Sequence, residues 1–447
     1  MRLSRSIPLL ALLAAGPLAA PPKMSAAPAQ TRLPFIENDY SSALAKARAR
    51  GVPIFVEAWA PWCHTCRSMQ AFVLTDPSLA KRADQFVWLA IDTERAENAP
   101  FKQKYPIDAL PTFFVLDAKS ESAALRWVGG ASVAQLQKIL DDGRRGVGGA
   151  SGSAGGIEEL LDRADRLYAK NDNARAAALY GQALERAPAG WPKYGRALES
   201  LLFALDASGD PERCARAALA AYPRLRKKPS AANVAGSGLG CALSVPADRA
   251  GRGDLVSALR SDALDVLAAP RPDIAADDLS GLYQALEEER ERAGDAAERT
   301  ALLERHAAFL EKEAARARTP AGRAVFDSHR LGAYLDLGQP QRAIPMLEQS
   351  ERDFPGDYNP PARLASAYRA MKKWDDAAAA SDRALAKGYG PRKIGILQVR
   401  ADIEAGRGDT TASRRALEEA LRIAEAMPEG QRSDRTIAAL KKKLEGS

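Results

Sequence analysis

The pattern of apolar and polar positions divides the chain into two parts with different periodicities. In the first part, short apolar runs at residues 54–58, 86–91 and 112–116 have the length and composition of buried strands. Residues 43–49 and 133–140 carry apolar side chains at helical spacing. Because helix and strand signals alternate, this part of the sequence predicts an α/β domain.

A stretch rich in glycine, serine and alanine separates the two parts. Residues 146–156 contain little that can be buried, and such a composition is typical of a flexible linker. We therefore expect the α/β domain at residues 30–145 and a second domain at residues 157–447.

After this linker the strand signals stop, and a weak repeat of about 34 residues begins. Its clearest copies lie at residues 167–188, 334–355 and 368–389. They place Ala176, Ala343 and Ala377 at one position, and Tyr180 and Leu347 follow four residues later in two copies. A small residue lets neighbouring helices approach, and a large one fills the groove beside it. These copies resemble the tetratricopeptide repeat, which implies an all-α solenoid of roughly five to eight helical pairs.

Residues 1–29 have the pattern of a secretory signal peptide. Arg2 and Arg5 precede an apolar run at residues 7–20, which is short and interrupted by prolines, and small residues at 27–29 suit a signal peptidase. We expect the mature chain to begin near Gln30, in a bacterial periplasm or outside the cell. An uncleaved membrane anchor is the alternative.

The composition is that of an ordinary folded chain, with 46% hydrophobic and 27% charged residues. The formal charge of +7 is mild for 447 residues, and acidic and basic residues alternate on helical stretches such as 287–298. This is the pattern of solvated helix faces, so we expect no nucleic acid as a partner.

Two of the four cysteines lie three positions apart in the sequence WAPWCHTC, residues 59–66. The motif follows a predicted strand and should begin a helix at Cys63. Free backbone N–H groups at a helix N-terminus lower the pKa of a thiol, so Cys63 is the expected nucleophile. Cys66, one turn later, can resolve a mixed disulfide. Zinc would need four ligands, and the motif with His64 offers three, so no metal is expected.

This stretch resembles the thioredoxin family, and further residues fit the family in order. Glu57 stands six residues before Cys63, where the family carries a buried acid, with Glu in place of the usual Asp. Leu110, Pro111 and Thr112 match the cis-proline loop that faces the cysteines. Asp92, Gly129 and Gly130 also match. The resemblance implies a thioredoxin fold for residues 30–145, thiol–disulfide exchange without a cofactor, proton transfer by Glu57 and partner pairing at Pro111.

The sequence also departs from thioredoxin itself. His64 and Thr65 stand where thioredoxin has Gly-Pro, and the following FVLTDPSL, residues 72–79, is more similar to the carboxy-terminal periplasmic domain of the transmembrane thiol reductases. A protonated His64 beside the nucleophile would favour the thiolate. The direction of electron flow stays open. We expect Trp62 to border and shield the site and Trp59 to pack beneath it.

The remaining cysteines and histidines lie in the repeats. Cys214 falls at a small-residue position of one helix and Cys241 in the next, and successive helices of a solenoid are neighbours. We predict a structural disulfide between them, with two buried free thiols as the alternative. His306 and His329 have no cysteine or acidic partner at ligand spacing, so we interpret both as surface or packing residues.

Two functional hypotheses follow from these features. The first is an exported thiol–disulfide oxidoreductase that acts on protein substrates with thiols or disulfides, exchanges electrons with a redox partner, and binds a peptide or protein in the groove of its repeats. The second is a repeat-based interaction protein in which the thioredoxin-like domain is a scaffold or redox sensor.

Overall fold

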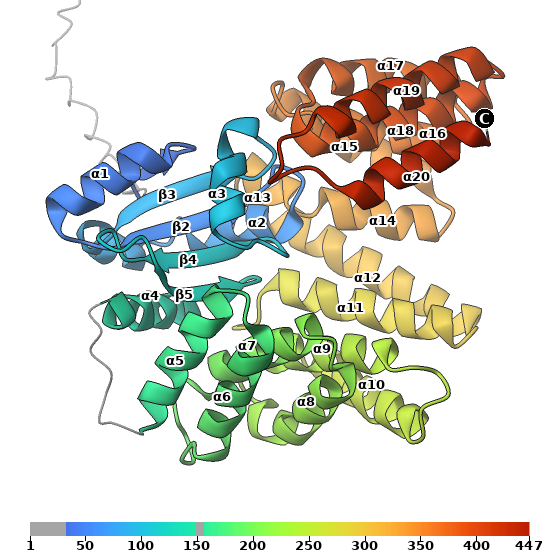
Figure 1. Cartoon of the computed structure of the whole chain (residues 1–447). Helices are drawn as coiled ribbons and strands as arrows, with labels where there is room; N and C mark the ends of the chain where they lie inside the picture. Colours follow the sequence, from blue (N-terminus) through green and yellow to red (C-terminus); the bar gives the residue numbers. More distant parts are fainter. Residues whose placement is uncertain (1–32, 148–155, 447) are drawn as a thin grey trace, which may run out of the picture.

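The computed structural model describes residues 33–147 and 156–446. The expected signal peptide and most of the expected linker lie outside these residues. Figure 1 shows an α/β domain beside a long helical region.

The α/β domain is built on one five-stranded mixed sheet with the strand order β1-β3-β2-β4-β5. The strands are β1 Phe35–Glu37, β2 Ile54–Trp59, β3 Val87–Asp92, β4 Thr112–Leu116 and β5 Ala123–Val128. β3 pairs in parallel with β1 and β2, whereas β4 runs antiparallel to β2 and β5. Every residue of β3 and β4 is buried, which explains their uninterrupted apolar sequences.

Helices cover both faces of this sheet. They are α1 Tyr40–Arg50, α2 His64–Ser68, α3 Ala99–Lys104 and α4 Val133–Val147, with a π-helical turn at Met69–Val73 and 3₁₀ segments at Pro77–Gln85 and Ala96–Asn98. Successive residues of β2 point to opposite faces, so that Phe55 packs in the core that includes Leu136 of α4 and Val56 packs in the core that includes Ala43 of α1. The sheet therefore has a hydrophobic core on each side.

The second part of the chain is entirely helical among the described residues. Its helices are α5 Ile157–Ala169, α6 Asn173–Glu185, α7 Tyr194–Ala207, α8 Pro211–Leu225, α9 Ala231–Ser244, α10 Arg252–Ala268, α11 Ala276–Arg292, α12 Ala296–Arg316, α13 Pro320–Ala324, α14 Asp327–Asp336, α15 Ile344–Asp353, α16 Asn359–Ala370, α17 Trp374–Lys387, α18 Gly390–Gly406, α19 Thr410–Ala426 and α20 Asp434–Glu445, with a 3₁₀ turn at Pro340–Ala343. The repeat positions Ala176, Ala343, Ala377, Tyr180 and Leu347 are all fully buried. Helix packing therefore accounts for the repeat.

The helical region curves around the α/β domain and contacts it at several points along its length (Figure 1). α5 packs on β5, and α11 and α13 pack on α2. Near the other end, the Gln431 side chain donates hydrogen bonds to the backbone oxygens of Thr93 and Arg95 at 2.9 and 2.8 Å. The sequence predicts that the groove of the repeats is free for a peptide partner. In the structure, the chain's own α/β domain lies against these helices and occupies that place.

A disulfide joins Cys214 of α8 to Cys241 of α9. The two helices approach closely because Gly238 of α9 carries no side chain. A Cβ atom there would lie only 2.6 Å from the Cβ atom of Ala218 in α8. The disulfide belongs to a large core of mostly alanine and leucine side chains.

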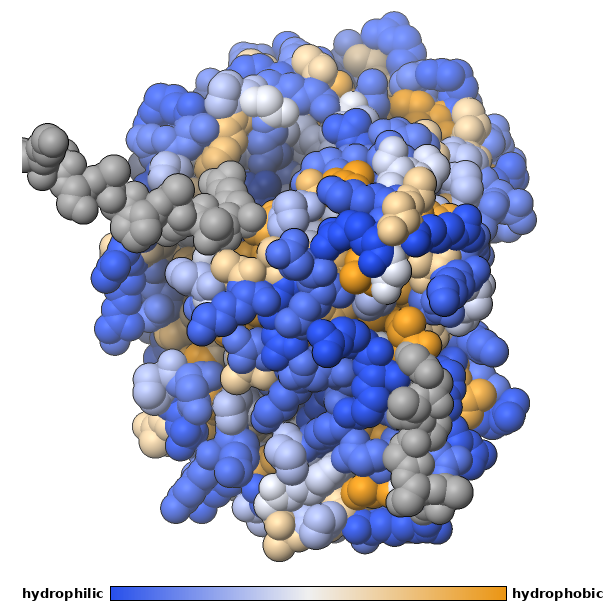
Figure 2. All heavy atoms as spheres, turned by 90° about the vertical axis from the view of Figure 1, so that its left-hand side faces the viewer, coloured by the Kyte–Doolittle hydropathy of each residue, from blue (hydrophilic) through white to orange (hydrophobic). Residues whose placement is uncertain are grey.

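Figure 2 shows the face of the molecule on which the α/β domain lies. Most residues on this face are hydrophilic, and the hydrophobic ones are scattered between them without forming one large patch. Within the described residues, no helix combines the length and the apolar character needed to cross a membrane.

Candidate functional site

The Cys63–Cys66 disulfide lies where β2 ends and α2 begins. Cys63 is the N-cap of α2, and the backbone N–H of Cys66 donates a hydrogen bond to Cys63 Sγ at 3.0 Å. Cys63 is 5% exposed and Cys66 is fully buried. The same N–H group and the positive end of the short helix would stabilise negative charge on Cys63 Sγ once the bond is reduced.

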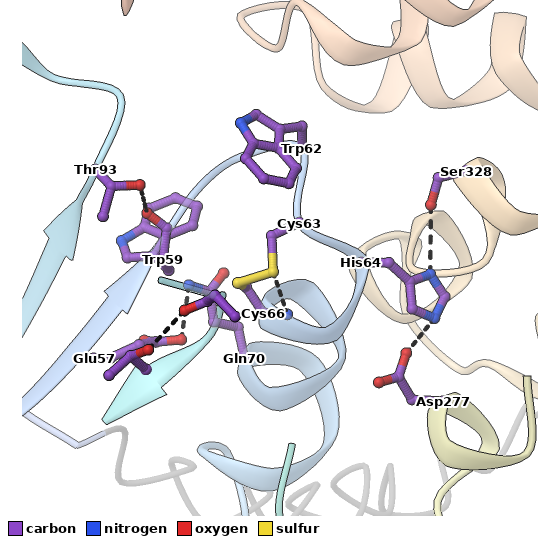
Figure 3. Close-up of a disulfide and its surroundings, with 12 residues drawn as sticks. Glu57, Trp59, Trp62, Cys63, His64, Cys66, Gln70, Thr93, Asp277 and Ser328 are labelled. Atoms are coloured by element: carbon purple, nitrogen blue, oxygen red, sulfur yellow. Dashed lines mark hydrogen bonds and ion pairs between the residues drawn. A yellow bond between two sulfur atoms is a disulfide. The ribbon is translucent and has the colours of Figure 1, made fainter. Parts of the chain in front are cut away.

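Apolar side chains surround the two sulfur atoms. Ala60 and the partly buried Trp59, Trp62 and Leu110 pack with the cysteines in one cluster. The Trp62 ring is held by a hydrogen bond from its Nε1 to Glu94 Oε1 at 3.0 Å. Trp62 therefore borders the site (Figure 3).

Glu57 lies on β2, on the side of the disulfide opposite His64 (Figure 3). It is only 2% exposed, and its Oε1 accepts a hydrogen bond from Gln70 Nε2 at 3.2 Å. Burial raises the pKa of Glu57 to about 8, with Gln70 opposing the shift and Glu37 adding to it. A carboxyl with this pKa can take up or release a proton near neutral pH.

The loop before β4 also reaches the site. The Leu110–Pro111 peptide bond is cis. The Pro111 carbonyl accepts a hydrogen bond from Gly129 N at 2.9 Å, and the buried Thr112 hydroxyl donates to the Ala109 carbonyl at 2.6 Å. These bonds fix the loop between the cysteines and the turn that follows β5.

His64 turns away from the sulfur atoms and toward the helical region (Figure 3). Its Nε2 contacts a carboxylate oxygen of Asp277 on α11, and its Nδ1 lies 3.5 Å from the Ser328 hydroxyl on α14. The sequence places His64 next to the expected nucleophile Cys63, but both ring nitrogens of His64 contact residues of the helical region. The imidazole therefore faces Asp277 and is not directed at Cys63.

All three histidines of the chain meet at this interface. The rings of His64 and His329 stack in parallel with centroids 3.6 Å apart. The Ser280 hydroxyl lies 2.7 Å from His329 Nδ1 and 2.8 Å from His306 Nε2, and His306 Nδ1 lies 2.8 Å from Glu287. Of the two interpretations of His306 and His329, surface or packing residues, the structure supports packing, because His306 is buried and His329 is partly buried at this interface. The acidic partner of His306, Glu287, was not expected from the sequence.

The pKa values of the two neighbouring carboxyl groups Asp277 and Asp278 are shifted in opposite directions. Burial alone would raise the pKa of Asp277, but the charge of His64 and hydrogen bonds from His64 and Thr65 hold it below its ordinary value. Burial, then the charges of Asp277 and Glu199, raise the pKa of Asp278 well above its ordinary range. Burial and the nearby His64 lower the pKa of His329. Asp277 is thus the anion that partners His64.

The segment after β3 is held by the C-terminal helices. The Tyr389 hydroxyl donates to Asp92 Oδ2 at 2.5 Å, and Arg392 N donates to Glu94 Oε2 at 2.6 Å. Since Glu94 also accepts the hydrogen bond from Trp62, one carboxylate links the cysteine motif to α18.

The cysteines and their thioredoxin-like neighbours were predictable from the sequence, whereas Asp277, Ser328 and Glu94 were not. No local pattern ties these residues to the motif. Nowhere in residues 33–147 or 156–446 do three or more His, Cys, Asp or Glu side chains form a group that could hold a metal ion.

Comparison with known proteins identifies both parts of the chain. Residues 36–118 match a family model described as thioredoxin-like, and residues 334–392 match a tetratricopeptide repeat model. The fold and the motif therefore define a thioredoxin-like domain followed by an all-α tetratricopeptide-repeat region.

Among the curated relatives are proteins named thiol:disulfide interchange protein DsbD. The one from Pseudoalteromonas atlantica is 31% identical over 91 residues, which cover 20% of this chain and 15% of the relative. The one from Yersinia pestis is 26% identical over 99 residues, which cover 22% of this chain and 17% of the relative. The similarity thus spans about a sixth of the relatives' length.

Solved structures similar to the chain include repeat proteins. A tetratricopeptide repeat protein from Parabacteroides merdae is 13% identical with a TM-score of 0.42, over 65% of this chain and 98% of that chain. The TPR2AB domain of yeast Sti1 is 15% identical with a TM-score of 0.24, over the same shares of the two chains.

Proposed function

We propose that the protein is an exported thiol–disulfide oxidoreductase that exchanges disulfides with protein substrates through Cys63 and Cys66. The observation that carries this proposal is the position of Cys63 as the N-cap of α2, with Cys66 one turn later. The similarity to thiol:disulfide interchange proteins over the same domain supports it.

Exchange proceeds in two displacements. The Cys63 thiolate attacks one sulfur of a partner disulfide, which forms a mixed disulfide and releases the other partner sulfur as a thiolate. Cys66, as its thiolate, then attacks Cys63 Sγ, which closes the Cys63–Cys66 disulfide and releases the second partner thiolate. Two electrons pass to the partner, whose thiolates take up two protons. The reverse sequence oxidises a partner dithiol.

Two further residues take part in this scheme. Glu57 accepts the proton that Cys66 loses before it attacks, because its carboxyl titrates close to neutral pH. Pro111, with Leu110 and Thr112, offers the backbone beside which an incoming chain is held. Trp62 and Thr65 line the approach to the sulfur atoms.

The experiment that tests the proposal is trapping with Cys66→Ala. This variant should stop at the mixed disulfide, so that partners from a periplasmic extract remain attached and are released by a reducing agent. Cys63→Ala is the matched control and should trap few partners, since Cys66 is fully buried. A Cys66→Ala variant without covalent partners, together with a wild type that cannot reduce a model disulfide, would contradict the proposal.

A second candidate function is an interaction protein whose thioredoxin-like domain senses redox state. It is favoured by the direct contact of the helical region with the motif, through Asp277 on His64 and Asp357 on Arg67 at 3.6 Å. If the domain is a sensor, reduction of Cys63–Cys66 should change hydrogen exchange in α11 and α14. Unchanged exchange in both helices argues against a sensor.

Export is part of the proposal and has its own test. The polar–apolar pattern of residues 1–29 supports it. Mass spectrometry of the protein from a periplasmic fraction should find a mature chain that begins near Gln30. Recovery of the protein in the cytosolic fraction would contradict export but would not contradict the proposed exchange chemistry.

A further inference from the structure

A cavity of about 430 Å³ lies between the two domains, beside the redox motif. Thr65 and Gly130 of the α/β domain line one side. Asn233 of α9 and Asp278 of α11 line the other, and His329 also contributes. The volume lies within the range of ligand-binding pockets, and both domains are needed to form it.

Two glycines keep this cavity open on the helical side. Gly236 and Gly281 line it from the interiors of α9 and α11, where glycine destabilises a helix relative to alanine. A Cβ atom at Gly281 would meet nothing within 4 Å, and one at Gly236 would meet only Leu282 at the ordinary distance of 3.5 Å. Helix packing does not require these two glycines, unlike Gly238. Their consequence is open space.

The cavity has an unusual charge for this chain. The protein contains 64 lysines and arginines, yet none of them is among the described residues that line the cavity. Its acidic side chains are Asp277, which is paired with His64, and Asp278, whose neutral form is favoured by burial and by the charges of Asp277 and Glu199. An ammonium or guanidinium group beside Asp278 would offset the charges of Asp277 and Glu199 and favour the ionised carboxylate as its partner.

We propose that this cavity binds a cationic segment of the partner polypeptide, with a lysine or arginine side chain beside Asp278 while a nearby cysteine of the same partner reaches Cys63. The inference rests on the exchange activity proposed above and names the class of substrate that the site prefers. The helical region thus forms the second wall of the substrate site, in place of the groove that the α/β domain occupies.

The preference can be measured with three disulfide peptides that differ only in flanking arginine, serine or glutamate residues. The full-length wild type, reduced beforehand, should show a kcat/KM about tenfold higher for the arginine peptide than for the glutamate peptide. Asp278→Asn should remove most of this difference, and it should fold because it removes a crowded carboxyl. Equal kcat/KM values for the three peptides with the wild type would overturn the proposal.

A second variant tests the cavity itself. Gly281→Leu fills open space and improves the helix, so it should fold, and it should lower kcat/KM for the arginine peptide at least about fivefold. Turnover of hydroxyethyl disulfide, which is too small to need the cavity, should not change. Gly253→Leu is the matched control, because its Cβ atom also meets nothing within 4 Å but lies on α10, outside the cavity. An arginine peptide unaffected by Gly281→Leu would contradict the cavity as the site.

Failure of the inference and failure of the proposed function give different results. If the wild type turns over hydroxyethyl disulfide without any charge preference among the peptides, only the inference fails. If it turns over no disulfide, the exchange activity fails. Fluorescence anisotropy with a cysteine-free arginine peptide then still tests the cavity, and loss of binding in Gly281→Leu but not in Gly253→Leu would support it.

Discussion

The two disulfides of the molecule sit in regions that resemble each other in burial and differ in almost everything else. Cys63 and Cys66 are 5% and 0% exposed, and Cys214 and Cys241 are 0% and 4% exposed. The first pair occupies a helix N-terminus, with a buried glutamate behind it and a polar cavity beside it. The second pair joins two helices within a core of mostly aliphatic side chains.

The two pairs are thus equally buried, and what distinguishes them is the chemistry of their surroundings. Around Cys63, the N–H of Cys66 can stabilise negative charge, and the carboxyl of Glu57 can hold the proton that the proposed exchange moves. Around Cys214, neighbours such as Ala215 and Ala218 provide only packing. We therefore expect the first region to govern activity and the second to govern stability.

The largest expected effect is on exchange activity. Cys63→Ala should lower the rate of reduction of a model disulfide by roughly a thousandfold, because no other thiol of the chain lies at such a helix N-terminus. The double variant Cys214→Ala/Cys241→Ala should stay within about twofold of the wild type. Comparable losses in both variants would remove the functional distinction between the two regions.

The ranking should reverse for stability. Cys214 and Cys241 are 27 residues apart, and cross-linking a loop of this length contributes about 3.5 kcal/mol to the free energy of unfolding. The Cys63–Cys66 bond spans 3 residues and should contribute about 2 kcal/mol. Urea unfolding of the two double alanine variants without reductant checks this order, and a larger loss from removing Cys63–Cys66 would contradict it.

Glu57 should make the first region sensitive to pH. Its pKa of about 8 means that the folded chain keeps a proton which the unfolded chain releases above about pH 5, so the free energy of unfolding should fall as pH rises from about 5 to 8. Glu57→Gln should remove up to about 1.4 kcal/mol per pH unit of this slope and slow exchange by about 10- to 100-fold. The exposed Glu185 gives the control variant Glu185→Gln. A slope equal in all three proteins would show that Glu57 is not the group that titrates.

The smallest effect concerns the support of the loop after β3. Tyr389→Phe removes the hydrogen bond to the buried Asp92 and should lower the local opening free energy of residues 92–98 by about 1 kcal/mol. Hydrogen exchange measures this change. Tyr358→Phe is a close control, because the buried Tyr358 hydroxyl has no hydrogen-bond partner among the described residues. Equal protection in both variants would mean that the loop does not depend on α18.

Much of the fold could be predicted from the sequence where the environment of a segment is uniform. Strands β2, β3 and β4 are buried on both faces, so they read as continuous apolar runs. β5 was missed because Arg126 interrupts its apolar pattern. This arginine is fully buried, pairs with Asp108 at 2.8 Å and donates to the Tyr168 carbonyl of α5 at 3.4 Å. The partner from the helical region explains the buried charge, and no local pattern reports it.

The same limit applies to the site. The spacing of Cys63 and Cys66 and the position of Glu57 are local facts that a motif contains. The pairing of His64 with Asp277 and its stacking on His329 join residues more than 200 positions apart, and they depend on how the helical region docks. Nothing in the sequence around the three histidines predicts that they lie together at the interface between the α/β domain and the helical region.

The contacts of the helical region at both of its ends change how it should unfold. In an open array of repeats each pair touches only its neighbours, so the terminal pairs fray independently. Here α5 packs on β5, and Gln431, just before α20, is bonded to the backbone of Thr93 and Arg95. Both ends of the helical region are therefore attached to the same α/β domain. Because loss of either terminal pair would also break contacts with the α/β domain, we expect the two described regions to unfold together.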